Sequence, residues 1–384
     1  MPFEFAAAGR IVFGEGAVRE VAPSAAAMGR RALVVTGANP ERAAALGRAL
    51  EAAAVRCVPF AVAGEPSVDL VREGARFAQG ERCELVIAMG GGSALDAGKA
   101  LAALLTNTGD PLDYLEVIGR GQPLQKTPAP MIAVPTTAGT GSEVTRNSVL
   151  ASPEHRVKAS LRSASMLPRL AVVDPELTWG LPPAMTASTG LDALTQLIEP
   201  YVSTRANAMT DLYCVEGIRC AAHALPAAYA NGADGTARRD MSWASLLGGL
   251  SLANAGLGAV HGFAAPVGGM WAAPHGAVCA AVLPHAIDVN IRALRQRAPA
   301  SDALRRYDEV GRLLTGNPHA SAEDAVEWTA EICRRLAIPP LRTYGVRPED
   351  FSVLVEKAAK ASSMKANPIV LTPGELTEII ARAA

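Results

Sequence analysis

The stretch ELVIAMGGGSALDAGK (Glu84–Lys99) decides the fold of this chain. It begins as a short apolar run typical of a buried strand, and three glycines, Gly90–Gly92, separate that run from a segment with helical spacing. Glycines let the backbone approach an anion closely, and the N-terminus of the following helix favours negative charge. We therefore expect a strand, a phosphate-binding turn and a helix. Because Leu95 stands where the dinucleotide fingerprint has its third glycine, a tight turn without a ligand is the alternative.

A second stretch, MIAVPTTAGTGSE (Met131–Glu143), repeats the pattern of an apolar strand followed by a loop of small residues. Its hydroxyl groups and glycine N–H groups suit a phosphate or a ribose. The alternative is a helix start that Ser142 caps. Ligands of open parallel sheets bind at the carboxyl ends of the strands, so two such loops support each other as one binding region.

The first half of the chain alternates apolar strands with amphipathic helices, which predicts a mostly parallel sheet covered on both faces. The expected strands are Arg31–Gly37, Cys57–Val62, Glu84–Met89, Met131–Thr137 and Leu170–Asp174. Prolines then punctuate the chain, and helical patterns follow. The expected helices are Ala184–Ser203, Ala208–Tyr229, Arg238–Gly258, Gly276–Val289, Ala303–Leu314, Ser321–Leu336 and Asp350–Ala361. We expect a dinucleotide-binding α/β domain at 1–180 and an all-helical domain at 181–384, in keeping with a length of 384 residues.

Composition excludes several classes of protein. Lys and Arg number 36 against 37 for Asp and Glu, so nucleic-acid binding through bulk charge is not expected. Met241 to Ile287 contains no charged residue, but glycines, prolines and histidines interrupt it, which favours core helices over a membrane span. The six cysteines form no Cys-x-x-Cys pair and indicate buried thiols of a reducing compartment. With no signal-peptide pattern in MPFEFAAAGR, we expect a cytoplasmic protein.

Four residues of the second half form a candidate metal site. Asp192 and Gln196 are four residues apart and share a helix face, whereas His261 and His275 belong to the charge-free stretch. A carboxylate with two imidazoles suits a divalent transition metal. The alternative is a helix carboxylate and two hydrogen-bonded core histidines. Spacing by itself leaves both open.

Taken in order, these motifs resemble the iron-containing (group III) alcohol dehydrogenases. The motifs are GGGSALDAGK, PTTAGTGSEVT, SMLPRLAVVDPEL, GLDALTQLIEPYVS, GLGAVHG and PHG, and the resemblance runs from RIVFGEG to SSMKANP. It implies an α/β domain and a helical domain with NAD or NADP in the cleft between them, one divalent metal (iron, sometimes zinc) and a homodimer or larger homo-oligomer. Its metal-ligand positions match Asp192, Gln196, His261 and His275, of which Asp192, His261 and His275 are the expected catalytic residues. Its cofactor positions match Gly91, Gly92, Ser93, Asp96, Thr136, Thr137, Thr140, Ser142 and Lys158.

The chain departs from the family pattern at two positions. Position 196 is normally histidine, and the amide oxygen of Gln196 is a weaker ligand for iron or zinc than imidazole. A further histidine, often discussed as a proton carrier, is replaced by Ala265, so no proton donor can be named.

The resemblance implies hydride transfer between a nicotinamide cofactor and a small alcohol or aldehyde, with a metal polarising the substrate oxygen. Arg146 would hold a carboxylate if the substrate were a hydroxy acid or oxo acid. A metal-independent reductase of the maleylacetate reductase type is the alternative on the same fold. A lyase resembling dehydroquinate synthase fits the ordered motifs less well.

Two further expectations concern the cofactor and the assembly. The first strand ends at Gly37 and Asn39 without a carboxylate that would repel a 2′-phosphate, so NADP should be accepted at least as well as NAD. The alternative is that Glu41 folds back onto the ribose and keeps NAD selectivity. Phe3–Gly9 and Ile11–Phe13 form an apolar terminal strand that could pair with its copy in a dimer.

Overall fold

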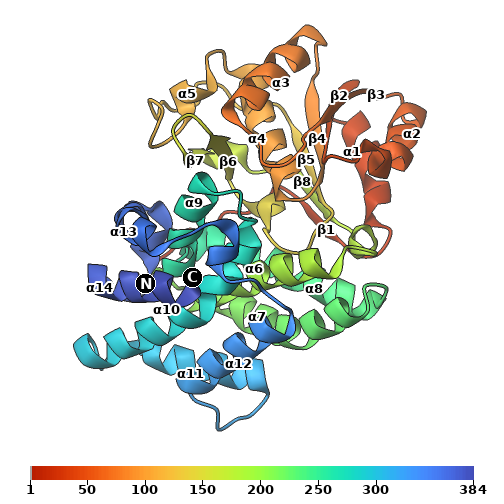
Figure 1. Cartoon of the computed structure of the whole chain (residues 1–384). Helices are drawn as coiled ribbons and strands as arrows, with labels where there is room; N and C mark the ends of the chain where they lie inside the picture. Colours follow the sequence, from red (N-terminus) through yellow and green to blue (C-terminus); the bar gives the residue numbers. More distant parts are fainter. Residues whose placement is uncertain (1) are drawn as a thin grey trace. The chain divides into compact units, whose positions relative to one another are not determined.

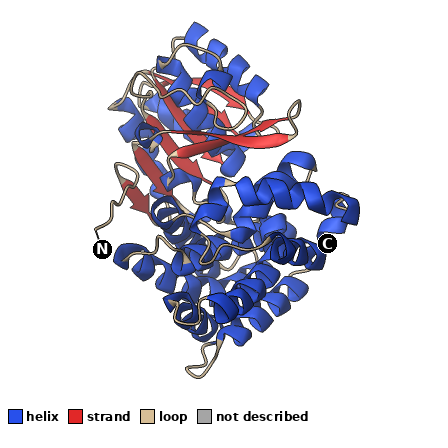
Figure 2. Cartoon of the chain, turned by 90° about the vertical axis from the view of Figure 1, so that its left-hand side faces the viewer, coloured by secondary structure: helices blue, strands red, loops and turns tan. Residues whose placement is uncertain are grey.

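The computed structural model describes residues 2–384, which divide into two compact units (Figure 1). The α/β unit comprises Ala6–Thr137 and Gly141–Thr178. The helical unit comprises Trp179–Ala384, Ala138–Thr140 and the segment up to Phe5. Every strand of the described residues belongs to the α/β unit (Figure 2). The main division, at Trp179, falls beside the boundary expected from the prolines, whereas the two short segments that join the helical unit were not expected.

The α/β unit is built on a six-stranded, all-parallel sheet with the order β1-β8-β5-β4-β2-β3. The strands are β1 (Ile11–Phe13), β2 (Arg31–Thr36), β3 (Arg56–Ala61), β4 (Leu85–Gly90), β5 (Met131–Pro135) and β8 (Leu170–Val173). The five strands expected from their apolar runs are all present. Consecutive central residues are buried on alternate faces, which explains why these strands read as continuous apolar runs.

Helices cover both faces of this sheet. Ala32 and Val34 of β2 pack in one core with α1 (Val21–Ala26) and α2 (Ala44–Ala52). Leu33 and Val35 pack in the opposite core with α3 (Val68–Gly80) and α4 (Gly92–Thr106). The chain runs from β2 outward to β3 and then crosses to β4 on the other side of β2. The order in which the chain adds strands therefore reverses between β2 and β4, and open α/β sheets bind ligands at such a switch point.

Two strands and a short helix lie outside the expected pattern, and the terminal strand is shorter than expected. β6 (Asn147–Ser152) and β7 (Val157–Arg162) form an antiparallel hairpin apart from the main sheet, and α5 is a single turn, Pro111–Tyr114. The terminal strand forms only at Ile11–Phe13, and it pairs with β8 of its own chain. Since Phe3–Gly9 has no strand structure, that part of the expected self-pairing strand was wrong. The homodimer itself stays a prediction.

The helical unit packs its helices around one large apolar core. The seven helices expected from the sequence are present, but the one expected at Gly276–Val289 continues eight residues further, to Arg297, and α9 and α14 were missed. The helices are α6 (Pro183–Val202), α7 (Ala208–Ala230), α8 (Gly235–Ala255), α9 (Ala259–Met270), α10 (His275–Arg297), α11 (Asp302–Thr315), α12 (Ala322–Arg335), α13 (Phe351–Lys360) and α14 (Pro373–Ala383).

The charge-free stretch forms most of α8, all of α9 and the first half of α10. Helix α10 is long and apolar enough to cross a membrane by composition, but 83% of its most apolar window is buried inside the protein. Helices α8 and α9 meet the same criterion only as a pair, and they are bent by 99°. Core helices of water-soluble proteins satisfy this test as well, so the stretch is explained by packing.

Candidate metal centre and cofactor loops

Helix α6 supplies the first group of the candidate metal centre, the carboxylate of Asp192. The side chain is 2% exposed, and its Oδ1 atom has no hydrogen-bond partner. Its polar neighbours include two imidazole nitrogens, at 3.4 Å and 3.7 Å, which lie at ion-pair distance without forming a hydrogen bond to Oδ1. Because burial of a carboxylate charge is costly unless it is compensated, a cation at this position would stabilise Asp192.

Helix α9 supplies His261, whose orientation is fixed by a glutamate that was not foreseen from the sequence. The imidazole Nδ1 lies 2.6 Å from Glu199 Oε2, and the other carboxylate oxygen accepts the Val260 N–H at 2.7 Å. With Nδ1 donating its hydrogen bond to Glu199, the Nε2 atom faces Asp192 Oδ1 at 3.4 Å and is the nitrogen that a metal ion would bind. Gly258 makes room for this carboxylate, since a Cβ there would lie 2.9 Å from Glu199 Oε1.

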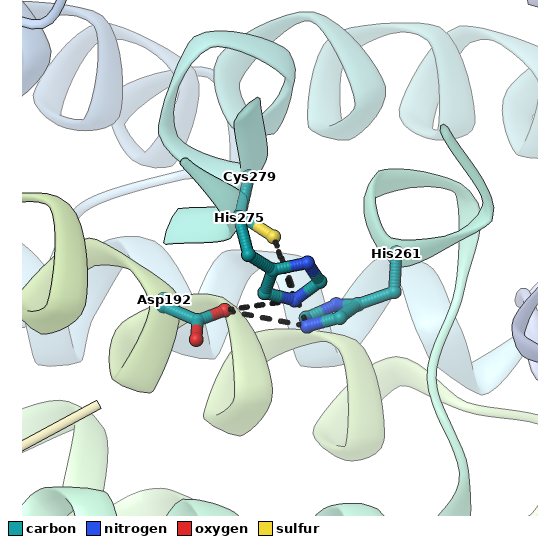
Figure 3. Close-up of side chains that lie close together, drawn as sticks. All are labelled: Asp192, His261, His275 and Cys279. Atoms are coloured by element: carbon teal, nitrogen blue, oxygen red, sulfur yellow. Dashed lines mark hydrogen bonds and ion pairs between the residues drawn. The ribbon is translucent and has the colours of Figure 1, made fainter. Parts of the chain in front are cut away.

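The first turn of α10 supplies His275 and, one turn later, Cys279. His275 Nε2 lies 3.7 Å from Asp192 Oδ1, and Cys279 Sγ lies 3.8 Å from His261 Nε2 and 3.7 Å from His275 Nε2. Figure 3 shows all four side chains converging on one point. The glycine of the PHG motif permits this approach, because a Cβ at Gly276 would lie only 2.2 Å from Ser188 O of α6.

The four side chains offer one ligand atom each, and all four atoms lie within 4.8 Å of one another. The set contains a carboxylate, two imidazoles and a thiol, which are the ligand types that zinc and ferrous iron accept. Asp192, His261 and Cys279 are buried, whereas the His275 side chain is 34% exposed, so the cluster opens to the surroundings on the His275 side. The residues thus fit a divalent metal ion.

Electrostatics at the cluster favour positive charge. Burial opposes protonation of His261, yet Cys279 and Glu199 raise its pKa well above the usual value. The same balance of burial against Cys279 and Asp192 raises the pKa of His275. Burial opposes ionisation of Asp192, but the two histidines lower the pKa of its carboxyl. These directions share one cause, the negative charge of the carboxylates and the thiol around the two imidazoles, which favours a positive charge at the cluster.

The two departures from the family pattern also have a definite place in the structure. Gln196 lies one turn after Asp192 on α6, and its Oε1 is buried without a hydrogen-bond partner. Ala265 lies one turn after His261 on α9, so no titratable side chain replaces the proton carrier at that position.

The expected cofactor loops follow three neighbouring strands, β2, β4 and β5. The three loops lie close to one another. A Cβ at Gly90 would lie 3.4 Å from Gly37 N, and one at Gly91 would lie 3.5 Å from Thr137 Cγ2. Helix α4 begins after Gly91 without a side-chain cap, so its first N–H groups are available to an anion. The structure thus brings together six expected cofactor residues: Gly37, Gly91, Gly92, Ser93, Thr136 and Thr137.

Asp96 and Ser142 bind each other, and they connect the two loops. Ser142 Oγ donates to Asp96 Oδ1 at 2.6 Å, while Asp96 Oδ2 accepts the Val149 N–H at 2.9 Å. The fully buried Lys99 donates to Ser142 O at 3.1 Å and to Thr145 Oγ1 at 2.9 Å. These contacts hold the second loop in place, a role distinct from the direct cofactor contact expected for Asp96 and Ser142.

Three other expected cofactor residues have contacts of their own or group with the helical unit. Lys158 Nζ pairs with Glu65 Oε1 at 3.0 Å. Asn39 Oδ1 accepts the Glu41 N–H at 3.1 Å and so begins the following helical turn. Thr140 belongs to the segment that groups with the helical unit. Their contact with a cofactor stays a prediction.

Sequence reasoning missed three functional side chains: Glu199, Cys279 and Lys99. Signals for them existed. Glu199 follows Asp192 by seven residues, and Cys279 follows His275 by four, so both pairs share a helix face. Cys279 had been interpreted only as a buried thiol, which it is, with the imidazoles as its neighbours. All six cysteines are free, as expected.

Comparison with known proteins agrees with this geometry. A family described as iron-containing alcohol dehydrogenase matches residues 8–175, and the C-terminal part of the same family matches residues 186–384. Alcohol dehydrogenase 4 of Saccharomyces cerevisiae is 36% identical, over 97% of this chain and 96% of its own. The 1,3-propanediol dehydrogenase of Klebsiella pneumoniae is 35% identical, with the same coverage of both chains.

Solved structures give the same picture. A 1,3-propanediol oxidoreductase matches with a TM-score of 0.92 at 33% identity, covering all of both chains. The sulfoacetaldehyde reductase of Bifidobacterium kashiwanohense, in complex with NAD+, matches with a TM-score of 0.86 at 29% identity, covering 99% of this chain and 98% of its own.

The fold and the site define an oxidoreductase with a parallel-sheet unit and a helical unit. The chain belongs to the iron-containing alcohol dehydrogenase family.

Proposed function

We propose that this enzyme is a metal-dependent NAD(P)-linked alcohol dehydrogenase that interconverts a small alcohol and its aldehyde. The observation that carries the proposal is Asp192 Oδ1, a buried carboxylate oxygen without a hydrogen-bond partner that faces two imidazole nitrogens. Asp192, His261 and His275 would hold the metal, with Gln196 or Cys279 as a fourth ligand.

The chain's own residues prepare the reaction. Glu199 keeps a proton on His261 Nδ1, so that Nε2 remains a ligand and the imidazole cannot rotate. The buried sides of the cluster exclude water, and the partly exposed His275 marks the side from which a substrate can approach. A divalent metal supplies a Lewis acid that polarises the substrate oxygen, and a nicotinamide cofactor supplies or accepts the hydride.

The cofactor proposal rests on the uncapped start of α4 and on the clustered ends of β2, β4 and β5. The NAD+ complex of the sulfoacetaldehyde reductase supports a nicotinamide dinucleotide as the ligand. Because a Cβ at Gly37 would meet no atom within 4 Å, the backbone at the end of β2 is open to a ligand.

The function is tested by metal content and turnover measured together. Protein purified without chelator should contain close to one iron or zinc ion per chain and should oxidise NAD(P)H with a small aldehyde. Removal of the ion by a chelator should abolish turnover, and re-addition should restore it. Full activity in the metal-free protein would refute metal dependence and would favour the maleylacetate reductase type, the alternative that Gln196 supports.

The substrate class is tested with a panel of alcohols and aldehydes that includes 1,3-propanediol, the substrate named for a relative. Oxo acids and an aldehyde sulfonate belong in the same panel, because Arg146 is half-buried and has no ion pair with any described residue. A preference for the anionic compounds that disappears in Arg146→Gln would assign the hydroxy-acid alternative.

A further inference from the structure

We infer that the Cys279 thiolate is the fourth metal ligand, occupying the coordination place that an imidazole at position 196 would fill. The inference rests on the proposed metal-dependent function and deepens it. It names the side chain that serves as the fourth metal ligand. It also predicts a metal–sulfur bond, whereas the ligand pattern of the family contains no sulfur.

Distances within the cluster match a coordination shell that includes sulfur. With zinc bonds of about 2.05 Å to nitrogen or oxygen and about 2.3 Å to sulfur, an ideal tetrahedron separates nitrogen from oxygen by about 3.4 Å and nitrogen from sulfur by about 3.6 Å. Asp192 Oδ1 lies 3.4 and 3.7 Å from the two imidazole nitrogens. Cys279 Sγ lies 3.8 and 3.7 Å from the same two atoms. These four separations are within about 0.3 Å of the ideal values, and all four atoms lie within 4.8 Å of one another, so they suit one shared ion.

The surroundings of Cys279 differ from those of the half-buried Cys333 and Cys57. Cys333 donates its S–H to Ala280 O at 3.3 Å, and Cys57 lies 3.7 Å from Gly47 O, so both have backbone carbonyls as partners. The neighbours of Cys279 are the two imidazole nitrogens and the Asp192 carboxylate. The Cys279 thiol is aimed at three candidate metal-binding atoms and so is placed as a ligand (Figure 3). Cys333 and Cys57 pack as half-buried side chains against the apolar cores.

Ligand chemistry favours the thiolate over the competing amide. Gln196 offers a neutral carbonyl oxygen, a hard donor better suited to magnesium or calcium than to zinc or iron. A thiolate is a strong donor to both transition metals and carries the negative charge that the amide lacks. Cys279 therefore compensates for the missing imidazole, and the number of protein ligands stays at four.

X-ray absorption at the zinc edge of the full-length, zinc-loaded protein tests the inference directly. One sulfur scatterer per zinc at about 2.3 Å is expected, beside nitrogen and oxygen at about 2.0 Å. A shell of nitrogen and oxygen alone, with one zinc per chain, would overturn the inference while leaving the proposed function intact. A chain that binds no metal would contradict both.

Cobalt substitution then identifies the cysteine. Cobalt-loaded wild-type protein should show an intense near-ultraviolet thiolate-to-cobalt charge-transfer band. The band should vanish in Cys279→Ser and persist in the control Cys333→Ser, in which the hydroxyl can keep the hydrogen bond to Ala280 O. A band retained in Cys279→Ser would exclude Cys279 as the source. If Cys279→Ser fails to fold, Gln196→Ala provides the second measurement, since its band should equal that of the wild type and a lost band would count against the inference.

Discussion

Glu199 Oε2 lies 2.6 Å from His261 Nδ1, and the other oxygen of the same carboxylate accepts the Val260 N–H at 2.7 Å. Both oxygens are thus used as acceptors of adjacent donors on α9, and the metal-facing nitrogen of His261 is fixed by a residue that touches no metal. Glu199 is a positioning residue, and its carboxylate also adds negative charge beside the cluster.

The first prediction is that Glu199→Gln weakens metal binding. Glutamine has one acceptor oxygen, so its NH2 group would face either the His261 or the Val260 N–H. The loss of orientation should reduce metal affinity about 10- to 100-fold. Competition with a chromophoric chelator measures this, and Glu327→Gln, at an exposed position on α12, is the control. Unchanged affinity in Glu199→Gln would show that His261 is held by packing alone.

The second prediction is a rescue experiment at the two positions that compete for the fourth ligand place. Cys279→Ala should lower zinc affinity at least about tenfold, equivalent to about 1.4 kcal/mol. Adding Gln196→His to that variant should restore affinity, because the imidazole returns to the position that the family uses. Gln196→His by itself should change affinity little in the wild-type background, because Cys279 already occupies that coordination place.

Failure of the double variant to regain zinc would mean that position 196 does not reach the ion. The affinity of Gln196→Leu is a useful control, since leucine removes the amide without adding a ligand, and it should bind zinc as the wild type does. These measurements do not depend on turnover, so they remain informative if the substrate is unknown.

Much of the fold could be predicted because burial on both faces leaves a plain signal. Strands β2, β4 and β5 are continuous apolar runs, and the glycines after β4 mark the turn. Strand β1 has only three residues and the β6–β7 hairpin is partly exposed, so their patterns are weak. Helix α9 contains three glycines and a proline among its twelve residues, and tertiary packing overrides that poor propensity.

The sequence predicted only those residues of the candidate site that belong to the ordered family motifs. Asp192, His261 and His275 match an ordered family motif, and the structure does bring them together. Cys279 was not foreseen, because a buried cysteine is common and the sequence does not say which face of α10 meets α6. That information lies in the close packing of Gly276 against Ser188 O, which is visible only in three dimensions.

The third prediction concerns Glu143, which is buried in the second loop. Burial is the main cause that raises the pKa of its carboxyl to about 7, and Lys99 only partly opposes it. The folded chain therefore holds a proton that the unfolded chain releases near pH 4.5, so stability is lost as pH rises from about 4.5 through about 7.

Glu143→Gln removes this titration. At pH 8 the variant should have a larger free energy of unfolding than the wild type, by up to about 3 kcal/mol, and should therefore unfold at a higher temperature. This gain in stability should be smaller at pH 5. Calorimetry at both pH values measures it, with the exposed Glu154→Gln as control. An equal effect of Glu143→Gln at pH 5 and pH 8 would show that the carboxyl does not titrate in this range.

The fourth prediction is that NADP(H) is accepted at least as well as NAD(H). Strand β2 ends at Gly37 and Asn39 without a carboxylate to accept bonds from the ribose hydroxyls and repel a 2′-phosphate. Arg42 follows, but its Nη2 already donates to Leu177 O at 3.0 Å, so the acceptance of NADP depends chiefly on the absence of a carboxylate that would repel the 2′-phosphate.

A substitution at Gly37 tests this prediction, because a Cβ at that position would meet no atom within 4 Å and Gly37→Asp should therefore fit without a clash. That variant should lose kcat/KM with NADPH and gain it with NADH, whereas Gly37→Asn, a neutral side chain of the same size, should change the ratio little. Steady-state kinetics with both reduced cofactors measures this preference. A wild-type preference for NADH of about a hundredfold in kcat/KM, equivalent to about 2.7 kcal/mol, would contradict the prediction. It would indicate that Glu41 folds back and binds the ribose hydroxyls.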